Sequence, residues 1–310
     1  MWEHEQLVVR TGRRSGMTTM VAIHSSEAGP AVGGCRMKAY PTINDAVTDV
    51  LRLSKAMTLK CAAAGIAHGG AKSVIVVDRP LTPELRRAVL LDHADLINSF
   101  GGQYQAGPDV GTGPDDMVVL RELTPHAYCL PEEHGGTGSS SGPTARGVLA
   151  ALGAAAEKVF GSADLTGKKV VISGFGSVGE LVARGLPGAD VLVSDVDGSR
   201  RTDEFGWVAP EEAYTTSADV LVPAAVGGVL SPEVVRALDV RLVVGPANNQ
   251  LTDDSVAGLL AERGIVWVPD HVASAGGVVY TLAREDEGLD HESALERVDA
   301  IAGTVRRLLA

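Results

Sequence analysis

The chain has 310 residues, of which 45% are hydrophobic, and it carries a formal net charge of -12. This length exceeds what one hydrophobic core usually supports and predicts two domains of roughly 150 residues each. The acidic balance argues against nucleic acid or an anionic membrane as a partner, since both bind basic surfaces.

The segments that govern location and redox state indicate a cytoplasmic protein. The start, MWEHEQLVVR, lacks the basic and then apolar order of a signal peptide, and no apolar run is long enough to span a bilayer. The three cysteines, Cys35, Cys61 and Cys129, form no CxxC pair. We therefore expect reduced thiols, no zinc ligation and no membrane partner.

The first half of the chain alternates strand-like and helix-like stretches. Strands are predicted at residues 7–10 and 17–24, joined by the turn-prone TGRRSG. The next stretch, residues 28–41, is expected to be extended and loop-like. Apolar residues then recur at helical spacing over residues 44–57, which predicts a helix that ends just before Lys60.

A short apolar strand, residues 73–78, and a helix over about residues 82–100 follow. Pro83 stands at an early helix position, where proline is tolerated. The segment QYQAGPDVGTGPDDM then places Asp109 among glycines and prolines, and its local sequence favours a turn residue over a catalyst.

Two lysines lie twelve positions apart in MTLKCAAAGIAHGGAK, residues 57–72, with small residues between them. Burial lowers the proton affinity of a lysine because it disfavours the charged ammonium, so such a lysine can act as a base near neutral pH. Lys60 and Lys72 therefore suggest an anion clamp and a base. The alternative is that both are ordinary surface lysines.

The second half begins after a glycine- and serine-rich linker at residues 134–144, followed by an alanine-rich helix over about residues 145–160. The stretch KKVVISGFGSVGELVARGL then combines a strand, a GxGxxG pattern and a helix, the context in which these glycines bind a pyrophosphate. The next strand ends at Asp195, about twenty residues on, where an acid accepts hydrogen bonds from the adenosine ribose. Such an acid repels a 2'-phosphate and favours NAD over NADP.

Three more apolar segments, DVLVPAAV, RLVVG and GIVWVP, continue the pattern of a parallel sheet. Ligands of open α/β sheets bind where such strands end. We therefore expect Ala225, Gly227, Asn248, Asn249 and residues 274–277 to face the cofactor. For Asn248 and Asn249 the alternative is a role in capping a turn.

The motifs taken together resemble the amino acid dehydrogenases of the leucine, phenylalanine, valine and glutamate type. The matching stretches are GPAVGGCRM, MTLKCAAAGIAHGGAK, DVGT, GFGSVG, GPANNQL and SAGGV, in family order. The resemblance implies NAD-dependent oxidative deamination of an L-amino acid to a 2-oxo acid and ammonia, and the reverse reductive amination. It also implies a homo-oligomer that associates through the first domain.

The resemblance also implies roles for individual residues. Lys72 resembles the lysine that activates water, and Asp109 the aspartate that exchanges protons with the substrate amine and the water. Lys60 resembles the lysine that binds the substrate carboxylate. The residues implied in substrate binding are Gly33, Gly34, Lys60, Gly107, Asn249 and Val278, and those implied in cofactor binding are Thr144, Gly174, Gly176, Ser177, Val178, Gly179, Asp195, Ala225, Val226 and Asn248.

Two positions bear on the substrate side chain. Val32 stands where glutamate-type members have a lysine for the distal carboxylate, which implies an apolar substrate. Gly107 stands where leucine-type members have alanine and phenylalanine-type members glycine. A missing methyl group in a pocket wall admits a larger side chain, although it changes discrimination by only about 1 to 3 kcal/mol. We therefore expect an aromatic or branched-chain amino acid.

Some positions depart from the family pattern. Ser274 replaces an asparagine, Thr281 replaces an apolar residue, and the chain ends at Ala310, where similar proteins continue for several helical turns. These departures leave as one alternative a non-catalytic relative that acts as a binding or partner subunit. Another two-domain NAD(P) dehydrogenase is the second alternative.

The sequence thus predicts an α/β protein of two domains with a deep cleft between them. Residues 1–134 are expected to form the substrate-binding and catalytic domain. Residues 135–310 are expected to form a Rossmann-type NAD-binding domain with a C-terminal helix over residues 293–309.

Overall fold

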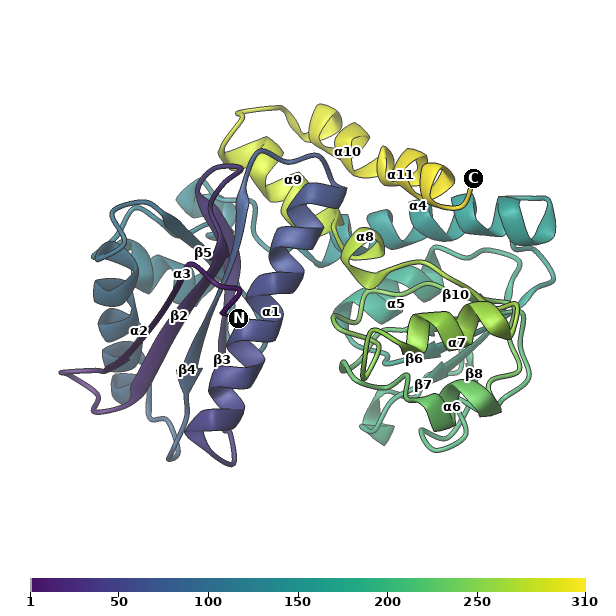
Figure 1. Ribbon diagram of the computed structural model, residues 1–310, viewed down its shortest axis with the longest axis horizontal. Helices are drawn as coiled ribbons and strands as arrows, with labels where there is room; N and C mark the ends of the chain where they lie inside the picture. The colour runs from purple at the N-terminus through teal and green to yellow at the C-terminus, as the bar shows by residue number, and fades with distance from the viewer. Residues whose placement is uncertain (1) are drawn as a thin grey trace. The chain divides into compact units, whose positions relative to one another are not determined.

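The computed structural model describes residues 2–310, which divide into two compact units (Figure 1). Unit 1 contains the chain up to Ser139 together with Arg284–Gly288, and unit 2 contains Ser140–Ala283 and Leu289–Ala310. The division falls inside the glycine- and serine-rich stretch at residues 134–144. The assignment of substrate and cofactor to separate domains stays a prediction.

Unit 1 is built on a mixed sheet of five strands. The first three strands in spatial order are antiparallel neighbours, and the last three are parallel neighbours. The order is β1 (Gln6–Thr11), β2 (Thr18–Ser25), β4 (Gly69–Val76), β3 (Ala31–Lys38) and β5 (Tyr104–Pro108).

Helices cover both faces of this sheet (Figure 1). They are α1 (Ile43–Ala63) on one face and α2 (Pro83–Asn98) and α3 (Pro114–Arg121) on the other. Side chains alternate between the faces along each strand. In β4, Val74 packs with Val50 of α1, whereas Ile75 packs with Leu90 of α2.

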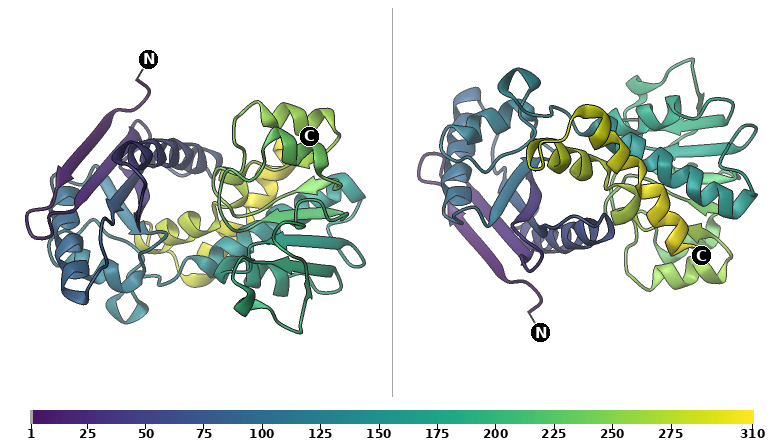
Figure 2. Two further views of the ribbon diagram at one scale, coloured as in Figure 1. Left: turned by 90° about the horizontal axis from the view of Figure 1, so that it is seen from below. Right: turned by 90° about the horizontal axis from the view of Figure 1, so that it is seen from above.

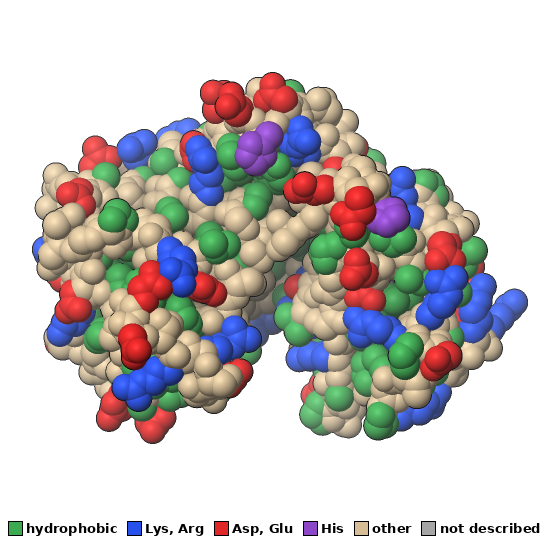
Figure 3. Space-filling view, turned by 180° about the vertical axis from the view of Figure 1, so that it is seen from behind, with side chains coloured by type: hydrophobic (Ala, Val, Ile, Leu, Met, Phe, Trp, Pro, Cys, Tyr) green, Lys and Arg blue, Asp and Glu red, His purple; other side chains and the backbone are tan. Residues whose placement is uncertain are grey.

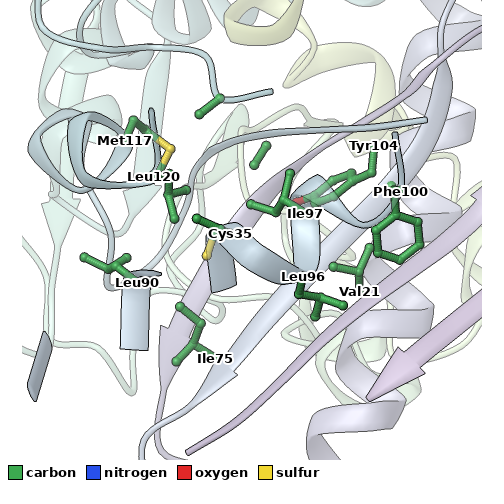
Figure 4. Packing of buried hydrophobic residues seen from close by; sticks show 14 of the residues in the cluster. Val21, Cys35, Ile75, Leu90, Leu96, Ile97, Phe100, Tyr104, Met117 and Leu120 are labelled. Atoms are coloured by element: carbon green, nitrogen blue, oxygen red, sulfur yellow. The ribbon is translucent and has the colours of Figure 1, made fainter. Parts of the chain in front are cut away.

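The larger core of unit 1 lies between the sheet and helices α2 and α3 (Figure 4). Cys35, Ile75 and Tyr104 contribute to it from three neighbouring strands. The Tyr104 hydroxyl lies inside this core and donates to the Gly33 carbonyl at 2.9 Å. Burying a hydroxyl costs little when it is hydrogen-bonded in this way.

The segment Arg284–Gly288 returns to unit 1 and is fixed there by its carboxylates. Glu285 accepts hydrogen bonds from the backbone N–H of Cys129 at 3.0 Å and of Thr137 at 2.8 Å. Cys129 has a positive φ of 59°, an uncommon conformation for a residue with a side chain. The Tyr128 hydroxyl donates to Asp286 in the same region.

Unit 2 contains a sheet of six strands, and within the described residues each strand runs parallel to its neighbours. The order reverses between β6 and β9, as in doubly wound folds, whose ligands bind where the order reverses. The parallel sheet predicted for this half is confirmed, while β8 was not predicted. The strands in spatial order are β11 (Val266–Trp267), β10 (Leu242–Val243), β9 (Val220–Pro223), β6 (Lys169–Ser173), β7 (Asp190–Ser194) and β8 (Gly206–Trp207).

The C-terminal helices of unit 2 lie alongside its first long helix, α4 (Figure 2). Arg146 of α4 forms an ion pair with Asp299, and Arg306 forms one with Glu157 of α4. The helices of the second half are α4 (Ser141–Phe160), α5 (Ser177–Arg184), α6 (Pro232–Ala237), α7 (Val256–Glu262), α8 (Asp270–Ala273), α9 (Gly276–Glu285), α10 (His291–Asp299) and α11 (Ile301–Leu308), with short 3-10 turns η1 (Glu132–His134) and η2 (Gly198–Arg200).

Two predictions about the lysine stretch were wrong in their boundaries. The helix before Lys60 continues to Ala63, because TLKCAA favours helix and no breaker occurs before Gly65, whose φ is +67°. Lys60 therefore lies in the last turn of α1. Strand β4 begins at Gly69, so Lys72 lies inside a strand and not before one.

Two other predicted elements also differ from the structure. The stretch expected as a loop at residues 28–41 contains β3, because pairing with β4 and β5 outweighs the low strand preference of its glycines. No element was predicted around Asp109, where the structure has β5 before this residue and α3 after it. The single helix expected over residues 293–309 is two helices, α10 and α11, that meet at Ala300.

Basic and acidic side chains are interspersed on the face shown in Figure 3. Neither positive nor negative charge is concentrated on this face. None of the helices within residues 2–310 is both long and apolar enough to cross a membrane.

The turn between β1 and β2 depends on one buried carboxylate of α2. Asp92 accepts hydrogen bonds from the backbone N–H of Arg14 and Ser15 and from the Ser15 hydroxyl at 2.7 Å. Replacing Asp92 by alanine leaves these donors without an acceptor and should lower the free energy of unfolding by about 1 to 3 kcal/mol. Denaturant unfolding at fixed protein concentration measures this loss.

The matched control is Asp95→Ala, which removes an exposed partner of the same Arg14. It should change the free energy of unfolding by less than about 1 kcal/mol. Burial raises the pKa of Asp92, but hydrogen bonds from Ser15 and Arg14 outweigh it and leave the pKa below its ordinary value. The stabilisation by Asp92 is therefore present above the ordinary carboxyl pKa and is lost as the pH falls. Equal losses in the two variants would contradict this account.

Candidate active site

The predicted catalytic residues of unit 1 gather on the face of the sheet that carries α1. Strand alternation places Lys72 on the same face as Val74, which packs against α1. Cys35 packs on the opposite face, so Gly34 lies on the α1 face. The register pairs Gly34 with Gly107 of β5, which brings three predicted site residues to one face.

Lys72 and Asp109 form a buried ion pair, with 3.0 Å between Nζ and Oδ2. The side chain of Lys72 is 6% exposed and that of Asp109 is 16% exposed. Asp109 directly follows β5, and its backbone N–H donates to the Thr112 hydroxyl, which in turn donates to the Cys35 carbonyl. The strand end and this turn therefore fix the position of the carboxylate.

The surroundings shift the pKa values of both groups. Burial lowers the pKa of Lys72, and the positive charge of Arg36 lowers it further, while Asp109 opposes the change. Burial alone would raise the pKa of Asp109, but the charges of Lys72 and Arg36 hold it well below its ordinary value. The site thus pairs an ionised carboxylate with a lysine that gives up its proton more readily than usual.

The glycines beside this pair differ in the space around them. A Cβ at Gly34 would lie 2.8 Å from Asp109 Cβ and 3.1 Å from Lys72 Nζ. A Cβ at Gly33 would lie 1.8 Å from the Ala71 carbonyl oxygen, so Gly33 is required for strand packing. A Cβ at Gly107 would meet no atom within 4 Å, so the wall of the site is open there.

Lys60 is buried in the last turn of α1, with 8% of its surface exposed. Helix α1 approaches β4 closely near this point, since a Cβ at Gly70 would lie 2.0 Å from the Thr58 nitrogen. A buried lysine on the helix that covers the Lys72 face is placed to attract an anion. The prediction that Lys60 and Lys72 are surface residues is thereby excluded.

Arg36 also belongs to this group, and sequence reasoning missed it. Its Nε donates to Asp109 Oδ2 at 2.7 Å, and its Nη1 donates to Asp49 Oδ2 of α1 at 3.0 Å. The signal that could have revealed it is its position in GGCRM, two residues after Gly34. In a strand, this spacing places both residues on the same face.

In the predicted dinucleotide fingerprint of unit 2, the backbone conformation and close packing allow only glycine at two positions. Gly174 has a φ of +114°, and a Cβ there would lie 2.5 Å from the Ala225 nitrogen. A Cβ at Gly179 would lie 2.0 Å from the Gly174 carbonyl oxygen. Gly176 is the N-cap of α5, and no side chain caps this end of the helix. The first N–H groups of α5, including those of Ser177 and Val178, are therefore accessible to a phosphate, as NAD or NADP requires.

Asp195 lies at the end of β7 beside the glycine turn. Its Oδ2 accepts from the Phe175 N–H at 2.8 Å, and its Oδ1 accepts from the Asp197 N–H at 2.9 Å. Each carboxylate oxygen can accept a further hydrogen bond, as from a ribose hydroxyl. The Nη1 of Arg200 donates to the Phe175 carbonyl, so a cation lies close to this carboxylate.

The remaining predicted residues of unit 2 occupy two further groups. The loop from Ala225 through the exposed Val226 lies beside Asn248, whose carbonyl oxygen would be 2.3 Å from a Cβ at Gly227. Asn249 has a φ of 52°, and its N–H donates to Asp270 at 2.8 Å. These two asparagines therefore lie in a tight turn at the ends of the parallel strands. A position in a turn is also what the alternative role, capping a turn, implies.

The second group surrounds the start of α9. A Cβ at Gly277 would lie 2.6 Å from the Thr144 hydroxyl of α4. Val278 is half-buried on α9, and Thr281 is buried one turn later. Ser274 is buried, and its hydroxyl donates to the Asp270 carbonyl at 2.6 Å, so it serves the helix end.

The groups described carry no arrangement suited to a metal ion. Within residues 2–310, no cluster of three or more His, Cys, Asp or Glu side chains is placed to hold one. Lys72, Asp109 and Arg36 instead suit proton transfer, since they combine a lysine of lowered pKa with an ionised carboxylate.

The paired glycines of β3 and β5 provide a direct test of this geometry. Gly34→Ala places a methyl group against Asp109 and Lys72, and should lower the free energy of unfolding by about 1 to 3 kcal/mol through overpacking. Gly107→Ala is the matched control, because its methyl group enters open space and should change stability by less than about 1 kcal/mol. Denaturant unfolding of both variants measures the difference, and a larger loss for Gly107→Ala would refute the described packing.

The family comparisons agree with these two units. Residues 4–126 match the family described as Glu/Leu/Phe/Val dehydrogenase, dimerisation domain. Residues 191–283 match the family described as Glutamate/Leucine/Phenylalanine/Valine dehydrogenase.

Individual relatives cover nearly the whole chain. A phenylalanine dehydrogenase of Lysinibacillus sphaericus is 40% identical over 96% of this chain and 81% of that protein. A leucine dehydrogenase of Bacillus cereus is 36% identical over 99% of this chain and 85% of that protein. The crystal structure of L-tryptophan dehydrogenase from Nostoc punctiforme matches with a TM-score of 0.78 and 31% identity, covering 99% of this chain and 89% of that one. The chain therefore belongs to the Glu/Leu/Phe/Val dehydrogenase family, whose members are NAD(P)-dependent oxidoreductases acting on the CH–NH2 group of amino acids.

Proposed function

We propose that this chain is an NAD-dependent L-amino acid dehydrogenase for apolar side chains, aromatic or branched. The single observation that carries the proposal is the buried ion pair of Lys72 and Asp109 beside Gly34. Burying two charges is costly, so a protein that needs only stability gains little from such a pair. Proton transfer to and from a bound amino acid gives the pair a chemical use.

Lys72 and Asp109 divide the proton transfers between them. In the deamination direction, Lys72 acts as the base that takes a proton from water as the water oxygen attacks the imine carbon. Asp109 exchanges protons with the substrate nitrogen, which leaves as ammonia. The low pKa of Asp109 and the lowered pKa of Lys72 support this division, because both groups act in their unprotonated forms.

Lys60 and the strand glycines are assigned to the substrate carboxylate. Lys60 is buried at the end of α1 and is proposed to supply the positive charge, and the backbone of Gly33 and Gly34 is proposed to line the same pocket. A carboxylate bound in this way orients the Cα–H bond of the amino acid. Asn249 and Val278 are also proposed as substrate-binding residues, as the family resemblance implies.

NAD is assigned to the glycine turn of unit 2. When bound, it accepts the hydride from the substrate Cα. Asp195 is proposed to accept hydrogen bonds from the adenosine ribose, with Gly174, Gly176 and Gly179 at the pyrophosphate. The remaining contacts are assigned to Thr144, Ser177, Val178, Ala225, Val226 and Asn248.

The side-chain pocket is assigned to the region of Val32 and Gly107. Val32 is buried and apolar, which disfavours a substrate with a distal carboxylate. The open space where a Gly107 side chain would begin favours a bulky substrate. The match of residues 4–126 to a dimerisation domain further supports a homo-oligomer.

The first test is oxidation of NADH with ammonia and a panel of 2-oxo acids, from phenylpyruvate and indolepyruvate to 4-methyl-2-oxopentanoate, 3-methyl-2-oxobutanoate and 2-oxoglutarate. Turnover that requires ammonia is expected with the apolar acids, and NADPH should support less. Lys72→Ala should lose at least about 100-fold in kcat, because it removes the general base. Lys55→Ala, which removes an exposed lysine paired with Glu3, should keep wild-type activity.

Absence of turnover from a folded protein that still binds NADH would contradict the proposed function for these substrates. Ammonia-independent turnover would instead indicate a dehydrogenase acting on a different class of substrate. Wild-type activity in Lys72→Ala would remove the assigned role of Lys72.

Substrate preference depends on the open wall at Gly107. Gly107→Ala adds one methyl group at a position that has no protein atom within 4 Å among the described residues. The ratio of kcat/KM for phenylpyruvate to that for 4-methyl-2-oxopentanoate should fall by about 10-fold to 200-fold, the effect of one methylene-sized change in a pocket. Steady-state kinetics with both acids measures the ratio, and an unchanged ratio would place the side-chain pocket elsewhere.

A further inference from the structure

The carboxylate of Asp109 is held through only one of its two oxygens. Oδ2 accepts from Arg36 Nε at 2.7 Å and lies 3.0 Å from Lys72 Nζ. Among residues 2–310, no hydrogen bond to Oδ1 is found. A carboxylate held in this way has a fixed plane, and one oxygen remains available to a ligand.

Arg36 is itself held in place from the opposite side. Its Nη1 donates to Asp49 Oδ2 of α1 at 3.0 Å, and the same oxygen accepts from the Tyr40 hydroxyl at 2.6 Å. The guanidinium therefore bridges a carboxylate that follows β5 and a carboxylate of α1. Only 13% of the Arg36 side chain is exposed. A planar guanidinium between two carboxylates has little rotational freedom, in contrast to a lysine.

We propose that Arg36 is a positioning residue that fixes the Asp109 carboxylate through Oδ2, so that Oδ1 is the oxygen that exchanges protons with the substrate amine. This inference rests on the proposed amino acid dehydrogenase activity. Arg36 touches no reacting atom in this arrangement. It acts through Asp109 and, by its charge, on Lys72.

The charge of Arg36 also separates the proton affinities of the two catalytic groups. Without Arg36, Lys72 would be the only cation in contact with Asp109, and the ion pair would favour the protonated lysine. Burial lowers the pKa of Lys72, the charge of Arg36 lowers it further, and Asp109 stays ionised. Lys72 can then act as a base while Asp109 keeps its negative charge.

The other titratable groups near this pair stay neutral around neutral pH. Burial raises the pKa of Cys35 to about 12, and it also raises the pKa values of Tyr40 and Tyr104. The further charges on this side are those of Asp49, of Lys38, whose Nζ lies 3.9 Å from Asp49, and of Lys60 in the last turn of α1. A change in the pH profile on replacing Arg36 is therefore attributable to Lys72 and Asp109.

The test compares Arg36→Gln, Arg36→Lys and Asp49→Asn with wild type. Arg36→Gln should lower kcat by about 100-fold, the cost of a misplaced catalytic group, while the Kd for NADH from its fluorescence stays unchanged. The acidic limb of the pH profile for deamination should move to higher pH, because removal of a positive charge raises the pKa of Lys72. Arg36→Lys should recover part of the loss, since it restores the charge without the planar bridge.

Asp49→Asn removes the outer anchor of Arg36 and leaves its contact with Asp109. It should cause a smaller loss of kcat in the same direction, and it keeps the proposal testable if Arg36→Gln does not fold. The matched control is Arg87→Gln, which breaks an exposed bidentate ion pair with Glu122 in the same unit. This variant should leave kcat and its pH profile unchanged.

A second readout separates this proposal from the proposed function. The pH dependence of Lys72 modification by an amine reagent, followed by mass spectrometry, reports the pKa of Lys72 without any turnover. A higher pKa in Arg36→Gln supports the role of Arg36 even if no 2-oxo acid is reduced, in which case the function alone fails. If wild type turns over, the role of Arg36 is overturned by Arg36→Gln kinetics within about threefold of wild type and an unchanged pKa of Lys72. A loss of kcat without any shift of the pH profile or of the pKa would reduce Arg36 to a structural role.

Discussion

The ion pair between Lys72 and Asp109 is the interaction on which the arrangement of unit 1 depends. Two opposite charges can stay buried only if both are held and hydrogen-bonded, because the desolvation penalty is several kcal/mol per ion, in order of magnitude. Strand β4 holds Lys72, and the turn that ends β5 holds Asp109. Gly34 of β3 lets the pair pack closely against the strand, since a Cβ there would lie 3.1 Å from Lys72 Nζ. Arg36 and Asp49 extend the pair into a network of alternating charge that reaches α1.

The parts of the fold that could be predicted from the sequence are those with a strong periodic or positional signal. The parallel sheet of unit 2 follows from continuous apolar runs, and the turn at Gly174 follows from a glycine pattern between a strand and a helix. The proximity of Lys72 and Asp109 was expected only from a family resemblance. No local pattern connects two residues on different strands, since their contact depends on strand order.

Other features could not be predicted because tertiary pairing decides them. Residues 31–38 contain two adjacent glycines and were expected to form a loop, yet they form the strand between β4 and β5. Arg36 was overlooked for the same reason, since the alternation that places it beside Gly34 exists only in a strand. The short strand β8 carries too few residues for a periodic signal. The break between α10 and α11 at Ala300 does not interrupt the apolar spacing of a helix, so the sequence pattern gives no sign of it.

The return of Arg284–Gly288 to unit 1 has a consequence for the order in which the chain acquires its structure. Glu285 supplies the acceptor for two backbone N–H groups near residues 129 and 137, but the ribosome delivers it about 150 residues after them. During synthesis, unit 1 therefore emerges before the segment that carries Glu285 has been made. The finishing step of unit 1 follows the synthesis of most of unit 2. Unit 1 can therefore be completed only when most of unit 2 has already been synthesised.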